Sequence, residues 1–141
     1  MNKIYIASDH AGFEMKEAIK KSMNNISFID LGTHSLDSVD YPDYAYALSN
    51  EVKKDEDSVG ILICGTGIGM CLAANKVSGI RCANVTSVTF AELAKQHNKA
   101  NVISLSGRYS SVELNVEIIN AFLSSTFEER HMKRINKLDK K

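Results

Sequence analysis

The 141-residue sequence predicts an α/β fold in which a parallel sheet of about five strands lies between two layers of helices. Short apolar runs alternate along the chain with segments of helical spacing. The central run, 59–64, is apolar at almost every position, as in a strand that is buried on both faces. Right-handed crossovers then give a doubly wound, Rossmann-like three-layer domain, and we expect ligands beyond the carboxyl ends of its strands.

The individual elements follow from these two periodicities. The expected strands are the apolar runs at 3–8, 26–31, 59–64, 81–86 and 101–106. The expected buried helix faces are Met15, Ile19 and Met23; Ala45, Leu48 and Val52; Phe90, Leu93 and Ala94; and Val112, Val116, Ile119 and Leu123. We expect one domain over 1–141, with 127–141 as a basic, helical C-terminal tail.

Composition and charge restrict the partners. Seventeen basic and seventeen acidic residues cancel, so the bulk charge gives no reason to expect nucleic acid or an anionic membrane. The chain opens on a strand-like run without a leader, and it has no apolar stretch of the ~18 residues that a membrane span needs. Three cysteines without a C-x-x-C pair argue against a disulfide framework or a structural zinc site. We therefore expect a cytoplasmic protein with reduced thiols.

The third strand ends at Cys64 and continues into a loop with glycine at every second position, 65–69. Glycines allow backbone N–H groups to converge on an anion, and donors at a helix N-terminus favour a thiolate. A base beside preorganised donors can form an oxyanion and stabilise it. The pattern predicts that Cys64 is catalytic, whereas Cys71 and Cys82 are expected to be structural because they fall inside a helix and a strand.

Two other interpretations of this loop stay open. A P-loop would need a lysine where Thr66 stands. A dinucleotide fingerprint would need G-x-G-x-x-G and an acidic residue about 20 positions later, and neither is present. A nucleotide-binding domain without catalytic activity is therefore one alternative, and a purely structural tight turn is the other.

Two histidines are candidates for proton transfer or anion binding. His97 ends a helical stripe just before Asn98, where the helix dipole favours imidazolium and hence an acid, although a packed core histidine fits the same position. His10 follows Asp9 at the start of a helix, where it would bind an anion or cap the turn.

Three arginines are candidates for binding a phosphate. Arg130 and Arg134 are four residues apart and share a helical face, which suits either an anion or a solvated tail balanced by neighbouring glutamates. Arg108 comes directly after the fifth strand, at the edge where ligands are expected.

Seven motifs occur in the order and spacing of type B ribose-5-phosphate isomerases, and they span nearly the whole chain. They are Asp9-His10-Ala-Gly12, Tyr41-Pro-Asp43, Cys64-Gly-Thr-Gly-Ile-Gly69, Ala73-Ala-Asn-Lys76, His97-Asn98, Gly107-Arg108 and Arg130-His-x-x-Arg134. The sequence thus resembles that family, which is itself similar to isomerases of galactose 6-phosphate and allose 6-phosphate. The resemblance implies interconversion of ribose 5-phosphate and ribulose 5-phosphate through a cis-enediolate, with a hexose 6-phosphate as the alternative substrate.

The resemblance also implies roles for matching residues. Cys64 would be the base, and His97 would open the sugar ring as proton donor, aided by Asp9 and Thr66. The residues implied to bind substrate are Asp9, His10, Gly65, Thr66, Gly67, Ile68, Gly69, Asn98, Arg108, Arg130 and Arg134, of which His10 and the three arginines would hold the phosphate. No metal or cofactor is implied, and the site would lie between the subunits of a homodimer or tetramer.

The sequence departs from the family pattern at two places. Some relatives use a glutamate just past the glycine loop, where this chain has Met70, so Cys64 is left as the base. The family often has two glycines before the arginine-histidine pair, where this chain has Glu128 and Glu129. Two carboxylates near a phosphate site would repel the anion.

Overall fold

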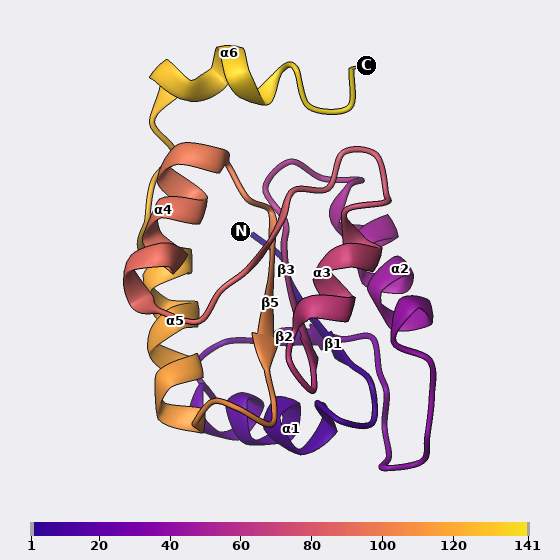
Figure 1. Ribbon diagram of the computed structural model, residues 1–141. Coiled ribbons are helices and arrows are strands. Elements are labelled where there is room, and N and C mark those ends of the chain that lie inside the picture. Colours follow the sequence, from indigo (N-terminus) through magenta and orange to yellow (C-terminus); the bar gives the residue numbers. More distant parts are fainter. Residues whose placement is uncertain (1, 141) are drawn as a thin grey trace.

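The computed structural model describes residues 2–140 and contains each of the five expected strands within its predicted range (Figure 1). Met1 and Lys141, the ends of the expected domain and tail, lie outside the described residues. In chain order the elements are β1 (Ile4–Ser8), α1 (Phe13–Ser22), β2 (Phe28–Asp30), α2 (Tyr41–Val52), β3 (Val59–Cys64), α3 (Ile68–Ala74), β4 (Cys82–Asn84), α4 (Val88–Asn98), β5 (Val102–Ser106), α5 (Val112–Ser124), the 3₁₀ turn η1 (Glu129–His131) and α6 (Met132–Ile135).

The sheet is parallel throughout, with strand order β2-β1-β3-β5-β4. Helices cover both of its faces, as predicted: α1, α4 and α5 pack on one side and α2 and α3 on the other (Figure 1). Successive residues of β3 alternate between these layers, with Ile61 and Ile63 facing the first side and Leu62 and Cys64 facing the second. This alternation directs the Cys64 side chain toward α2 and α3.

The predicted helix faces are correct for α1 and α2 and correct only in part for α4 and α5. Phe90, expected to be buried, is 62% exposed, whereas Ala94 is buried as predicted and Ala91 joins it on the buried face of α4. Alanine at this contact lets α4 lie close to its neighbours, because the distance between packed helices depends on the side chains between them. In α5 Ile119 is fully buried as predicted, together with Ile118 and Phe122, whereas the other predicted positions, Val112, Val116 and Leu123, are only partly buried.

One buried ion pair could not be predicted from the hydrophobic pattern of the sequence. The Lys16 side chain is completely buried, and its Nζ donates to Asp30 Oδ1 at 2.7 Å and to the Thr33 carbonyl at 2.6 Å. Lys20 Nζ donates to the other oxygen of the same carboxylate at 2.8 Å. Asp30 thus joins the end of β2 to α1.

The C-terminal tail is helical only in part. Residues 125–128 are extended, and the two short elements η1 and α6 follow. The Glu128 N–H donates to the Gln96 carbonyl at 2.9 Å, which attaches the tail to the last turn of α4. Among residues 2–140, no helix combines the length and apolar character that a bilayer crossing requires.

Candidate active site

The carboxyl ends of β1, β3 and β5 bring together the first group of predicted site residues. Ser8 pairs with Ile63 and Cys64 pairs with Ser106, so the three central strands end at the same level. Asp9 and His10 follow β1, the glycine loop follows β3, and Arg108 follows β5. As expected for a doubly wound sheet, residues from distant parts of the sequence meet at this edge.

Cys64 lies at the end of β3 with its thiol against the glycine loop. The backbone N–H of Gly67 donates to Cys64 Sγ at 3.1 Å. This N–H group is one of the backbone donors that the glycine loop is predicted to present. The residue is only 5% exposed, so within one chain the thiol has little access to solvent. The pocket of about 240 Å³ at this edge is lined by Thr66 and Ile68 but not by Cys64.

The backbone of the loop requires glycine at two of its positions. Gly67 caps α3 in the left-handed region with φ +87°, and a Cβ there would meet the side chain of Asn84 and lie 3.0 Å from the Leu105 carbonyl oxygen. At Gly69 a Cβ would lie 2.8 Å from the Tyr41 ring. Thr66 is exposed on the loop, and its Oγ1 accepts from the Ile68 N–H at 3.1 Å.

Asp9 and His10 have different environments. Asp9 is buried, and its Oδ1 accepts from the Gly12 N–H at 3.0 Å, an interaction that shapes the turn before α1. His10 Nδ1 accepts from the Val39 N–H at 3.1 Å. A neutral imidazole whose Nδ1 accepts carries its proton on Nε2, so His10 can offer Nε2–H to an anion.

Arg108 lies next to the glycine loop, with its backbone N–H bound to the Gly65 carbonyl at 3.1 Å and its side chain exposed. Two residues that sequence reasoning missed hold this turn. Ser106 Oγ donates to the Gly65 carbonyl at 2.8 Å, and buried Asn115 donates to the Ser106 carbonyl at 3.0 Å. The sequence features that could have identified them are a serine at the end of β5 and an asparagine at a position of α5 that faces the core.

The second group of predicted site residues lies at the opposite edge of the sheet. His97 and Asn98 end α4, which runs antiparallel to the strands, and Arg130 and Arg134 lie on the tail beside it. In Figure 1 α6 lies at the top of the molecule, whereas the β5 arrow points downward, so the carboxyl ends of the strands lie away from the tail. Strands of five or six residues separate the two edges by roughly 15 Å. One chain therefore does not bring His97 to Cys64.

The tail places a second histidine next to His97. The ring centroids of His97 and His131 are 4.7 Å apart. Glu128 Oε1 lies 2.8 Å from Arg130 Nη2 and 3.9 Å from His131 Nε2. Removal from water, together with the positive charges of Arg130 and Arg134, lowers the pKa of His131. His131 was not singled out in the sequence, although it lies inside the arginine-histidine motif.

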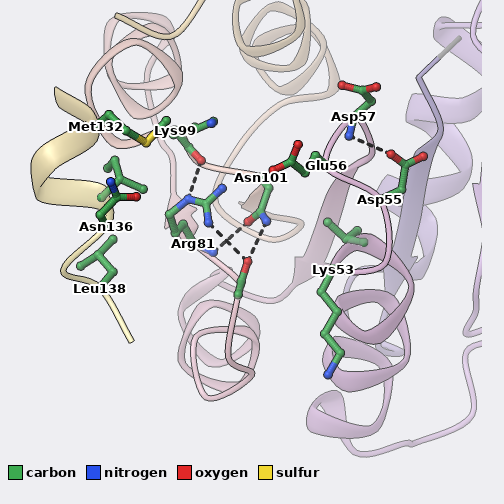
Figure 2. A pocket seen from close by; sticks show the side chains of 13 residues that line it. Lys53, Asp55, Glu56, Asp57, Arg81, Lys99, Asn101, Met132, Asn136 and Leu138 are labelled. Atoms are coloured by element: carbon green, nitrogen blue, oxygen red, sulfur yellow. Dashed lines mark hydrogen bonds between the residues drawn. The ribbon is translucent and has the colours of Figure 1, made fainter. Parts of the chain in front are cut away.

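A pocket of about 550 Å³ contains none of the predicted site residues. It lies at the amino edge of the sheet, between the loop after α2 and the tail, and it is lined by charges of both signs (Figure 2). Arg81 at its wall donates from Nε to the Lys99 carbonyl at 2.7 Å, and burial lowers its pKa. Because its hydrogen-bond partners are backbone carbonyls, Arg81 stabilises the backbone of this region.

Sequence comparison connects these features to known enzymes. The family model described as Ribose/Galactose Isomerase matches residues 4–138. The chain belongs to the ribose/galactose isomerase family. It is 48% identical over 139 residues to a probable ribose-5-phosphate isomerase B of Mycoplasma pneumoniae, over 96% of this chain and 91% of the relative.

Solved structures of ribose/galactose isomerases share the fold of the whole chain. A ribose 5-phosphate isomerase of Thermotoga maritima has a TM-score of 0.94 and 46% identity, over 99% of this chain and 98% of the other. Ribose-5-phosphate isomerase B of Mycoplasma genitalium, solved with bound ribulose-5-phosphate, has a TM-score of 0.90 and 43% identity, over 96% of this chain and 93% of the other. Family membership favours the isomerase interpretation over the nucleotide-binding alternative.

The structure shows the surroundings of Met70 and Glu128, two residues at which this ribose/galactose isomerase departs from the family pattern. Met70 is completely buried among the α2 and α3 side chains, where a carboxylate would need a partner. Glu128, expected to repel a phosphate, instead forms an ion pair with Arg130. This ion pair offsets the negative charge of Glu128 and restrains the Arg130 side chain.

Proposed function

We propose that this protein is an aldose-ketose isomerase that interconverts ribose 5-phosphate and ribulose 5-phosphate. The observation that supports this most directly is the position of Cys64, a thiol at the end of β3 that accepts a hydrogen bond from the Gly67 N–H. The family membership supports the same reaction, since relatives at 43–48% identity carry that name and one of them was solved with ribulose-5-phosphate.

In the proposed reaction Cys64 acts as a thiolate base. It takes the proton from C2 of the open-chain aldose, the electron pair of that C–H bond forms the C1–C2 double bond, and the π electrons of the C1 carbonyl move onto O1 to give a cis-enediolate. The proton of the C2 hydroxyl passes to O1, the C2–O bond becomes the new carbonyl, and the proton held by Cys64 returns to C1 to give the ketose. The negative charge on the enediolate oxygen is stabilised by N–H groups of the loop 65–69. Because C1 is reduced while C2 is oxidised within one molecule, the reaction needs no external redox cofactor.

The remaining predicted residues open the ring and bind the substrate. His97 donates the proton that opens the furanose, with Asp9 and Thr66 at the ring oxygens, and Asn98 binds sugar hydroxyls. Arg108 and the Nε2–H of His10 bind the phosphate from one side. Arg130 and Arg134, both exposed on the tail, bind it from the other.

This assignment requires two copies of the chain. His97 and Cys64 lie at opposite edges of one sheet, so the ring-opening acid must come from the partner subunit. A twofold axis that brings the tail end of one copy against the carboxyl edge of the other would make two complete sites. The same contact would surround Cys64 and the exposed side chain of Ile68 on α3, which is 54% accessible in one chain. We therefore propose a homodimer, or a tetramer built from such dimers.

The test is a comparison of substrates with the purified protein. The ratio kcat/KM is measured for ribose 5-phosphate, allose 6-phosphate and galactose 6-phosphate, and we expect the pentose to be preferred. A strong preference for a hexose phosphate would change the substrate that we propose but not the type of reaction. Tight binding of NAD or ATP without any isomerase activity would instead support a nucleotide-binding module. A pentose isomerase of this kind would serve the pentose phosphate pathway in the cytoplasm.

A further inference from the structure

Three side chains at the junction of α4 and the tail have the composition of a transition-metal site. His97, Glu128 and His131 each offer one ligand atom, and these atoms all lie within 4.8 Å of one another. The two imidazole rings come from separate elements, the last turn of α4 and the 3₁₀ turn η1, which the Glu128–Gln96 backbone hydrogen bond holds together. The three groups are partly buried.

His131 has a ring nitrogen that is available to bind a cation. Its side chain is 13% exposed, and within residues 2–140 its buried Nε2 has no hydrogen-bond partner. A buried imidazole nitrogen without a partner is unfavourable unless a ligand or water completes it.

We propose that His97, Glu128 and His131 form a binding site for a divalent transition metal of the zinc type. Two imidazoles and a carboxylate match the three protein ligands of open zinc sites, and imidazole nitrogen disfavours magnesium and calcium, which take oxygen ligands. At Zn–N and Zn–O bonds of about 2.0–2.2 Å, tetrahedral ligand atoms lie roughly 3.3 Å apart, so side-chain shifts of about 1.5 Å close the site.

Arg130 is the group that opposes the metal. It donates from Nε and Nη2 to Glu128 Oε1, and its positive charge lies beside the site. The Arg130 side chain is 66% exposed, so it can turn into solvent when a cation takes the carboxylate. Removing its charge should therefore tighten metal binding.

The site has a consequence for catalysis that depends on the proposed function. A metal bound to His97 takes a lone pair of the imidazole ring and so prevents the ring from becoming the imidazolium acid that would donate the ring-opening proton. Zinc should thus inhibit isomerisation of ribose 5-phosphate, and a chelator should restore it. Binding itself does not depend on the reaction, so the two inferences are tested separately.

The binding test is a calorimetric titration of the purified protein with ZnCl₂ in a buffer free of phosphate. We expect one site per chain, with affinity reduced at least about tenfold in His131→Gln and increased in Arg130→Ala. His34→Gln, which changes an exposed histidine outside the cluster, is the matched control and should bind as wild type. MgCl₂ should give no comparable heat.

The remaining cysteines need their own control because thiols also bind zinc. A hydrogen bond with the Cys82 thiol lowers the pKa of Cys71 to about 7, which makes this pair a competing site. The titration is therefore repeated in Cys71→Ser and Cys82→Ser, and the proposal expects the site to persist in both. Loss of binding in these variants, or unchanged binding in His131→Gln with its circular dichroism preserved, would overturn it. Anomalous scattering from zinc-soaked crystals should place the ion between the two imidazoles, and an ion found only elsewhere would equally refute the site.

Discussion

The backbone N–H of Gly67 points at the sulfur of Cys64, 3.1 Å away. The contact joins the last residue of β3 to the residue that caps α3. It places the proposed base, at the end of β3, beside a backbone donor of the glycine loop, and the predictions about catalysis depend on it.

Replacing Cys64 with alanine removes the proposed base and leaves the loop backbone in place. We expect kcat/KM for ribose 5-phosphate to fall by about 10²–10⁴-fold, the usual contribution of a positioned base. Binding of inorganic phosphate and the circular dichroism spectrum should be unchanged. Cys71→Ala is the control and should keep most of the activity, because the hydrogen-bond partners of that thiol are Cys82 and Asn75 and not the glycine loop. Full activity in Cys64→Ala would eliminate the thiol from the mechanism.

Gly67→Ala should disrupt the loop more than an equivalent change elsewhere. Gly67 has φ +87°, and a Cβ there would meet the Asn84 side chain and the Leu105 carbonyl, so the substitution adds a clash to backbone strain. Gly79 has a similar φ of +90°, but the nearest atom to its Cβ would be 3.9 Å away. We expect Gly79→Ala to cost about 1 kcal/mol of unfolding free energy and Gly67→Ala about 2–3 kcal/mol, with activity lost only in the latter. Urea unfolding and the isomerase assay distinguish them, and equal effects would contradict the geometry.

His97→Asn separates ring opening from proton transfer at carbon. Ribulose 5-phosphate is open-chain, so exchange of its C1 hydrogen with solvent requires the base but no ring opening. We expect net conversion of ribose 5-phosphate to fall about 10²-fold or more, while deuterium exchange at C1, followed by NMR in D₂O, is much less affected. If both rates fell by the same factor, His97 would not be the ring-opening acid.

A mixture of two inactive variants tests whether the site is shared between subunits. Cys64→Ala and His97→Asn each inactivate both sites of a homodimer, but a mixed dimer contains one site with both wild-type side chains. Random exchange should restore about a quarter of wild-type activity. Unmixed proteins at the same concentration are the control. Failure to recover activity, with subunit exchange verified by mass spectrometry, would argue against a shared site.

The Asp30 carboxylate should contribute to stability in a pH-dependent way. Burial opposes its ionisation, but hydrogen bonds from Lys16, Lys20 and the Gly32 N–H lower its pKa below the usual value near 3.8. A lowered folded pKa adds stability that is complete above the unfolded pKa and disappears as the pH falls through the folded one. Asp30→Asn also leaves buried Lys16 without its counter-ion, so we expect a loss of about 3 kcal/mol at pH 7 by urea unfolding. The difference from wild type should shrink below pH 4, and exposed Asp57→Asn should show neither effect.

The positions of the strands and of the Cys64 loop were predictable because they depend on local rules. A buried parallel strand reads as a continuous apolar run, and the residues just after it must lie at the carboxyl edge whatever the rest of the chain does. The buried face of α4 was not predictable in the same way. A stripe with Phe90 and one with Ala91 fit the helical period equally well, and only contact with α5 selects the smaller side chains.

The sequence by itself determined the order of strands and helices, the edge at which Cys64, His10 and Arg108 lie, and the family resemblance that the comparisons confirmed. The tertiary structure alone decided that His97 lies at the other end of the sheet, next to His131. Spacing along a chain specifies on which face of an element a side chain lies. It does not specify how far apart two elements lie once the sheet is formed, because that distance is set by the direction in which each helix returns across it.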